Sequence, residues 1–374
     1  MTKEKLKIGI IAAEHSGDRL GAKLISALQD FYDLELFGLG GPAVNALSIS
    51  TPSDIDHQDL QVMGIIDPLI NLPKLLKIRK KILNLFLANG VNLFIGVDSP
   101  DFNMYFHKKL KKSSVKTIQV VSPSVWAWRE NRIKAIHANI DLTLCLFRFE
   151  HQFYQQKNMN SFFLGHPFSS LQANDRNQII AKHQLSNSKN YISILPGSRK
   201  SEISCMMPIF LKAAKKITSI DSNSTFLIPA ANKELAQMIR SFNGLNEIDY
   251  KLAINTANDF LSVSKISIVT SGTASLEAAV LGSLPIICYK TNAINYAILS
   301  RMIKTPFIGL PNLLLQKHLF PELIQGDLSV NAIIENYLKL RDDSEHYHLS
   351  VLEINEAMQG QGFEAAAQAI QSLG

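Results

Sequence analysis

The sequence predicts an α/β protein made of two successive doubly wound domains, each with a parallel sheet between helices. Short apolar runs alternate with longer amphipathic stretches along the whole chain. The alternation restarts after GHPF at residues 165–168. The length of 374 residues also exceeds what one hydrophobic core usually fills. Two Rossmann-like domains that face a central ligand cleft are therefore the simplest architecture.

The apolar runs locate the strands of both domains. For the first domain we expect strands at residues 7–13, 91–97, 117–121 and 142–146. For the second domain we expect strands at residues 191–195, 224–229, 266–270 and 284–288. Apolar residues at helical spacing predict helices over 16–30 and 72–89. We expect the domains to span 1–168 and 169–349, with the closing helical stretch 350–374 joining the first.

The composition predicts a folded protein, and we expect it to use no cofactor. Apolar residues make up 46% and charged residues 19% of the chain, which excludes a disordered protein. No leader of signal-peptide type and no membrane span of about 18 apolar residues is expected. Cys145, Cys205 and Cys288 lie far apart without CxxC spacing, which indicates thiols in a reducing compartment. We expect a cytoplasmic protein.

The segment IAAEHSGDRLGA (residues 11–22) runs from the first predicted strand into a helix. Ser16 and Gly17 lie at this turn, where free backbone N–H groups can face an anion or a sugar hydroxyl. Glu14 would project from the carboxyl end of the strand, where α/β proteins bind ligands. The alternative is equally open: Ser16 is then a simple helix cap and Glu14 a solvated acid.

The segment GVDSPDFN (96–103) places two carboxylates after a buried strand. Asp98, at the tip of that strand, is well placed to take a proton from a substrate hydroxyl. Asp101 either shares the catalytic role or caps the following helix through its side chain. We favour Asp98 as the general base and keep Asp101 and Glu14 as the other candidates.

The segment SPSVWAWRENRIKAI (122–136) contains both tryptophans of the chain. Trp126 stands close to Arg129, so apolar area lies beside a cation that can receive a phosphorylated, partly apolar ligand. The alternative is a pair of packed core aromatics followed by a solvated basic helix.

Two segments of the second domain suit a nucleotide diphosphate. LPGSRKSEI (195–203) follows a strand, and Arg199 can make charge-assisted contacts to phosphate unless it is an ordinary loop residue. In TSGTASLEAA (270–279) a strand ends and a helix begins at Ser271, Gly272 and Thr273, whose N–H groups suit phosphate. Glu277 can accept bonds from ribose hydroxyls. The alternative is a capping box formed by Thr273 and Glu277.

The basic surplus, a net charge of +6, concentrates in DPLINLPKLLKIRKKILNLF (67–86). Its lysines and arginine alternate with apolar residues, which suits an anionic bilayer surface. The candidate membrane residues are Leu69, Leu72, Leu75, Leu76 and Lys77. A buried helix with a solvated basic face is the alternative. Nucleic acid is disfavoured because no aromatic residue interleaves the run before Phe86.

Taken in order, these segments resemble the lipid-A-disaccharide synthase family almost from end to end. VSPSVWAW, and GLPNLL followed by PEL, carry the resemblance most specifically, whereas SGTASLE is shared with other nucleotide-sugar enzymes. The chain departs from the family pattern at Ala13–Glu14–His15, where Gly–Glu–Ala is usual, and at Leu315, where a small residue is usual.

The resemblance implies a GT-B fold and an inverting, metal-independent hexosyltransferase of lipid A biosynthesis. The donor would be UDP-2,3-diacylglucosamine, and the acceptor 2,3-diacylglucosamine 1-phosphate (lipid X). The products would be the lipid A disaccharide 1-phosphate and UDP. The family also implies peripheral attachment to the cytoplasmic face of the inner membrane of a Gram-negative bacterium, and a homodimer with exchanged C-terminal elements.

The implied site has two halves. The UDP half takes Arg199, the turn Ser271–Thr273 and Glu277, with Asn312 and Gln316 nearby. The acceptor half takes Glu14, Ser16, Gly17, Asp98 and the region Trp126–Arg129. Two other functions stay open: a UDP-N-acetylglucosamine epimerase or undecaprenyl-linked transferase of the same fold, and a nucleotide-sugar-binding or scaffold protein without turnover.

Overall fold

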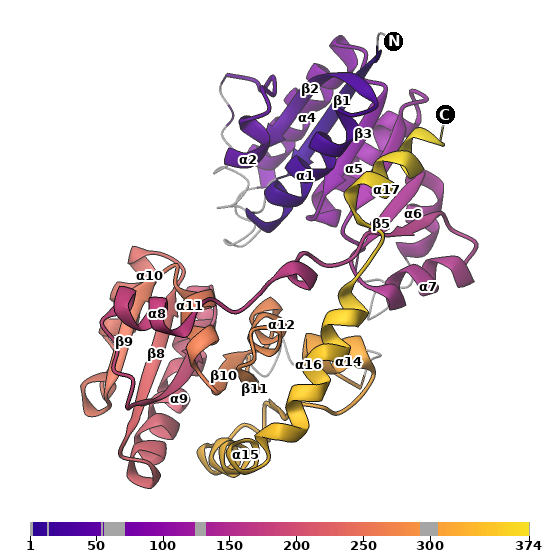
Figure 1. Ribbon diagram of the computed structural model, residues 1–374. Helices are drawn as coiled ribbons and strands as arrows, with labels where there is room; N and C mark the ends of the chain where they lie inside the picture. Colours follow the sequence, from indigo (N-terminus) through magenta and orange to yellow (C-terminus); the bar gives the residue numbers. More distant parts are fainter. Residues whose placement is uncertain are drawn as a thin grey trace. The chain divides into compact units, whose positions relative to one another are not determined.

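The computed structural model describes residues 3–12, 15–53, 55, 72–123, 132–291 and 306–373. The chain divides into two compact units. The first comprises Met1–His166 together with Gly360–Gly374, and the second comprises Pro167–Gln359. Each unit holds one parallel sheet with helices around it, as the alternating apolar pattern predicts (Figure 1).

The first unit has a six-stranded sheet in the order β2-β1-β3-β4-β5-β6. Its strands are β1 (Glu4–Ala12), β2 (Tyr32–Gly40), β3 (Leu93–Val97), β4 (Lys116–Val120), β5 (Leu142–Cys145) and β6 (Ser161–Phe163). Its helices are α1 (His15–Leu28), α2 (Pro42–Asn45), α4 (Leu72–Ala88), α5 (Pro100–Lys111), α6 (Ile133–Asn139), α7 (Arg148–Gln156) and α17 (Gly362–Gln371). All pairings are parallel, so the carboxyl ends of the strands share one edge.

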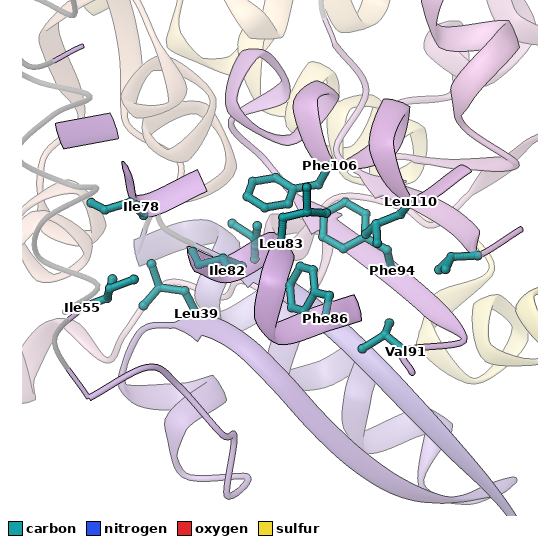
Figure 2. Close-up of a cluster of buried hydrophobic side chains, with 12 residues drawn as sticks. Leu39, Ile55, Ile78, Ile82, Leu83, Phe86, Val91, Phe94, Phe106 and Leu110 are labelled. Carbon is teal, nitrogen blue, oxygen red and sulfur yellow. The ribbon is translucent and has the colours of Figure 1, made fainter. Parts of the chain in front are cut away.

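An aromatic cluster joins α4 and α5 to the sheet of the first unit (Figure 2). Phe86 of α4, Phe94 of β3 and Phe106 of α5 are fully buried. Their ring centroids lie 5.7–5.9 Å apart in tilted or edge arrangements, which aromatic pairs prefer. The cluster therefore fixes α5 against β3 and positions the turn between them.

Helix α4 buries one face and exposes the other. Ile78, Ile82 and Leu83 pack into the same core, and Leu75 packs against it. Leu76 is 50% exposed and Leu87 is 49% exposed. The exposed face also carries Lys74, Lys77, Lys80 and Lys81. Leu75 is thus a core residue, whereas Leu76 is available at the surface. No helix within the described ranges combines the length and apolar character of a membrane span.

The second unit has a six-stranded parallel sheet in the order β12-β11-β10-β7-β8-β9. Its strands are β7 (Asn190–Leu195), β8 (Ser224–Ala230), β9 (Tyr250–Ile254), β10 (Ile266–Thr270), β11 (Leu284–Tyr289) and β12 (Glu322–Ile324). Its helices are α8 (Arg176–His183), α9 (Lys200–Ile220), α10 (Lys233–Arg240), α11 (Ala257–Val263), α12 (Thr273–Val280), α14 (Leu310–Leu315), α15 (Val330–Asp342) and α16 (Ser344–Met358).

The C-terminal stretch is shared between the units. The sequence assigns all of 350–374 to the first domain, but α16 is counted with the second unit and only α17 with the first. The N–H groups of Gln361 and Gly362 donate to the carbonyls of Phe163 and Leu164 at 3.0 and 3.1 Å. These bonds seat α17 in the first unit, where it packs beside α1 (Figure 1).

Gly360 lies directly against the chain of the first unit, just before α17. A Cβ atom there would overlap the backbone of Gly165 and Leu164. We expect Gly360→Ala to lower the free energy of unfolding by about 2 kcal/mol, the usual cost of overpacking a site that cannot relax. Thermal or urea unfolding measures this loss. Gly326→Ala is the control, since a Cβ there meets nothing within 4 Å. Equal stability of the two variants would show that the chain around Gly360 is loosely packed.

Candidate active site

Each unit has a topological switch point, where the strand order reverses and two neighbouring strands lead into helices on opposite faces. It lies between β1 and β3 in the first unit and between β7 and β10 in the second. Ligands of doubly wound proteins bind outside the carboxyl ends of the strands at such points. The polar segments found in the sequence follow these same strands.

Asp98 lies directly after β3, at the switch point of the first unit. Its backbone is left-handed, with φ of 53°, and its side chain is half-buried. One carboxylate oxygen accepts the N–H of Ser99 at 3.0 Å. A Cβ atom on Gly17 would lie 3.3 Å from the Cβ of Asp98, so the first turn of α1 adjoins Asp98. The Ser16–Gly17 turn and Asp98 therefore lie side by side, and their common role in an acceptor site stays a prediction.

The second carboxylate of this turn, that of Asp101, already has a partner. Asp101 lies in the first turn of α5 and is exposed, and its carboxylate forms an ion pair with Arg132. Its carbonyl accepts the Arg79 guanidinium at 2.9 Å. Ser99 occupies the cap position of α5, so the helix-capping alternative for Asp101 is wrong.

Several predicted site residues lie outside the described residues. They are Glu14, Trp126, Arg129 and Leu69. Their assignments stay predictions.

At the switch point of the second unit, α12 begins without a side-chain cap. Gly272 is the cap residue, with φ of 154°, and has no side chain with which to accept the N–H groups of the first turn. The predicted alternative, a capping box of Thr273 and Glu277, is therefore wrong. The Ser271 hydroxyl instead donates to the Ile308 carbonyl at 3.2 Å. The Ser275 N–H donates to the Gly272 carbonyl at 3.1 Å, so the N–H groups of Thr273 and Ala274, with the positive dipole end of the helix, are the ones that can face an anion.

Glu277 lies one turn further along α12. Its side chain is half-buried, and burial raises the pKa of its carboxyl group above the ordinary value. A partly desolvated carboxylate gains strongly from hydrogen-bond donors such as sugar hydroxyls.

The turn after β7 is held by a residue that the sequence did not single out. The carboxylate of Glu202 accepts the N–H groups of Ser198 and Arg199 at 3.0 and 3.2 Å. It also forms an ion pair with the Arg199 guanidinium at 3.3 Å. The acid three residues beyond the helix start is a capping signal that could have identified it. A carboxylate thus occupies the donors that were expected to bind phosphate.

Asn312 and Gln316 lie on and beside α14, but they differ in exposure. Asn312 is fully buried. Its amide nitrogen donates to Glu322 at 2.8 Å and its oxygen accepts the Phe320 N–H at 2.8 Å. Asn312 therefore organises the chain segment around it, and its contact with the nucleotide stays a prediction. Gln316 is exposed, with a left-handed backbone.

No cluster of three or more metal-ligating side chains is present among the described residues.

Sequence comparison identifies relatives along the whole chain. A model of the family described as lipid-A-disaccharide synthetase matches residues 8–373. The lipid-A-disaccharide synthase of Idiomarina loihiensis is 36% identical over 377 residues, which cover 98% of each chain.

Solved structures resemble the fold at low identity. The glycotransferase of kitacinnamycin has a TM-score of 0.62 at 9% identity, with 99% of each chain covered. A UDP-GlcNAc 2-epimerase from Neisseria meningitidis bound to UDP-GlcNAc has a TM-score of 0.59 at 11% identity, with 99% of this chain and 98% of that chain covered. Two parallel-sheet units of this kind form the GT-B fold. The chain therefore belongs to the lipid-A-disaccharide synthase family and is a glycosyltransferase of lipid A biosynthesis.

Proposed function

We propose that this enzyme transfers the sugar of UDP-2,3-diacylglucosamine to 2,3-diacylglucosamine 1-phosphate, with inversion at the anomeric carbon. The observation that carries the proposal is the family match over residues 8–373, with the polar segments of that match at two switch points. The products are the β-1,6-linked disaccharide 1-phosphate and UDP.

The second unit binds UDP in this proposal. The uncapped start of α12 at Gly272 receives a phosphate group, because its N–H groups and helix dipole favour an anion. Glu277 accepts bonds from the ribose hydroxyls, which compensate the burial of its carboxylate. Gln316 is exposed and stays a candidate ligand.

Arg199 acts on the diphosphate by exchanging partners. In the free enzyme its guanidinium and N–H group are bound by Glu202. A diphosphate carries more charge than a carboxylate and accepts bidentate bonds from arginine. It therefore competes with Glu202 for these donors, and Arg199 stabilises the charge that develops on UDP as it leaves.

The first unit binds the acceptor and supplies the base. The acceptor 6-hydroxyl attacks the anomeric carbon of the donor, and the bond from that carbon to the UDP oxygen breaks. The hydroxyl proton passes to Asp98, which lies at the switch point beside the first turn of α1.

The exposed face of α4 contacts the membrane that supplies the acylated substrates. Leu76 and Leu87 lie about three helical turns apart and so face the same side. Lys77 and Lys80 are exposed between them. Each cation near an anionic lipid surface adds about 1 kcal/mol of attraction. We propose peripheral attachment to the cytoplasmic face of the inner membrane through this helix.

Arg199→Ala should lose about 2–4 kcal/mol of UDP binding or of transition-state stabilisation, the range for a charge-assisted contact. Calorimetric titration with UDP and the rate of disaccharide formation measure the two. Lys200→Ala is the matched control, because Lys200 is also exposed and pairs with Glu234 instead. Wild-type UDP affinity together with wild-type turnover in Arg199→Ala would remove Arg199 from the site.

Asp98→Asn should fold normally and turn over at least about a hundredfold more slowly, the usual contribution of a general base. The assay follows disaccharide formation from both acylated substrates. Asp101→Asn is measured beside it and should remain active, since Asp101 pairs with Arg132. An active Asp98→Asn with an inactive Asp101→Asn would reverse the assignment. Activity in both would leave Glu14 as the remaining candidate.

The double variant Leu76→Ser, Leu87→Ser should bind anionic vesicles more weakly than wild type, because both leucines are exposed. Leu75 is left unchanged because it packs on the core. Co-sedimentation with vesicles containing phosphatidylglycerol measures binding, which should also weaken as salt rises. Ile220→Ser is the control, since Ile220 is 43% exposed in the second unit. Wild-type binding by the double variant would place the membrane contact elsewhere.

A further inference from the structure

The main chain at Asp98 adopts the left-handed conformation, which is uncommon outside glycine although aspartate adopts it more often than most residues. Asp98 and Ser99 are consecutive residues with positive φ, at 53° and 36°. Non-glycine residues hold this conformation only when their surroundings over-determine it, and such residues cluster at functional sites. We therefore expect hydrogen bonds that stabilise the backbone conformation of Asp98.

Two buried side-chain amides hold the Asp98 carbonyl. The amide nitrogen of Asn103 donates to it at 2.8 Å, and that of Gln119 donates at 3.0 Å. The Asp98 N–H donates to the Val120 carbonyl at 2.9 Å. Asn103 and Gln119 are both 0% exposed, so water does not compete for these bonds.

The spacing of GVDSPDFN explains how Asn103 reaches this position. A Cβ atom at Gly96 would lie 2.9 Å from the Cβ and Cγ of Asn103. Gly96 therefore leaves the room into which the Asn103 side chain folds back from α5 onto the end of β3. The motif GVDSPDFN thus contains both Asp98 and Asn103, whose amide bonds the Asp98 carbonyl.

His107 fixes the orientation of Gln119. The Gln119 nitrogen faces the carbonyls of Asp98 and Val120, the latter at 2.9 Å, so it must be the donor end of the amide. Its oxygen then faces Nε2 of His107 at 3.0 Å, and Nε2 must carry the proton. Burial lowers the pKa of His107 to about 4, which keeps the ring neutral. The ring also packs against Phe94, with centroids 4.9 Å apart.

We infer that Asn103 and Gln119 are positioning residues for Asp98, and that His107 positions Gln119. The backbone conformation at Asp98 sets the direction in which its Cα–Cβ bond leaves the strand. A general base must lie within hydrogen-bond reach of the hydroxyl it deprotonates, so a swing of that bond costs rate rather than binding. This inference rests on the proposed role of Asp98 as the base.

The test replaces Gln119 and Asn103 by apolar residues of similar shape, Gln119→Met and Asn103→Leu. We expect kcat to fall at least about tenfold in each, with KM for both substrates within about twofold. His107→Phe should lower kcat less, and His107→Gln, which keeps a donor near Nε2, should restore most of it. Thr117→Val is the matched control, because Thr117 is a buried polar residue of the same strand β4 that bonds Asn139 and Asp141 instead. Its kcat should equal wild type at a similar loss of melting temperature.

A second readout does not depend on activity. Crystal structures of Gln119→Met and Asn103→Leu should show that φ at Asp98 has left the left-handed region. A retained φ near its wild-type value, or wild-type kcat in both variants, would overturn the inference. If wild type forms no disaccharide, or Asp98→Asn keeps full turnover, the proposed function or base fails instead, and the φ angle still decides whether the amides hold Asp98.

Discussion

The reversal of strand order between β1 and β3, and between β7 and β10, is the constraint on which the rest of this structure depends. Strands that are parallel and buried on both faces can be connected only through helices. Where two neighbouring strands send their helices to opposite faces, the sheet edge between them stays uncovered. Asp98 and the start of α12 lie at those two places. The strand order therefore predicts where each unit binds a ligand, independently of the side chains.

Three loops of this chain have the same arrangement, in which one carboxylate accepts the N–H groups of two consecutive residues. Asp18 binds the start of α2, Glu202 the turn before α9, and Glu322 the loop at Ile308 and Gly309. Each bond pair satisfies donors that would otherwise be uncompensated. Gly272 at the start of α12 supplies no such side-chain cap, which is why we propose this helix start as the anion site. The Glu202 turn can serve phosphate only by exchanging one anion for another.

The sequence predicts eight of the strands because their apolar runs are buried on both faces. It misses four strands. Two lie at sheet edges and are only partly buried: β2, where Asp33 and Glu35 interrupt the run, and β9. The other two, β6 and β12, have three residues each and are too short to show a period. At the site, residue order along the strands places Asp98, Ser271 and Arg199 at strand ends. The burial of Asn312 and its bonds to Glu322 and Phe320 could not be predicted, because a polar residue in a glycine- and proline-rich segment gives the same pattern whether it binds a ligand or its own chain. Gln119 went unnoticed, although a single amide inside an apolar strand is the signal of a buried hydrogen bond.

We propose that this chain joins two acylated sugars, whereas an epimerase would alter one sugar alone. Mass spectrometry of the reaction of the purified enzyme with UDP-2,3-diacylglucosamine and 2,3-diacylglucosamine 1-phosphate tests it most directly. The account predicts equimolar disaccharide 1-phosphate and UDP, without added metal, and no reaction of unacylated UDP-N-acetylglucosamine alone. Conversion of that unacylated sugar by itself, or UDP binding without any disaccharide, would contradict the account.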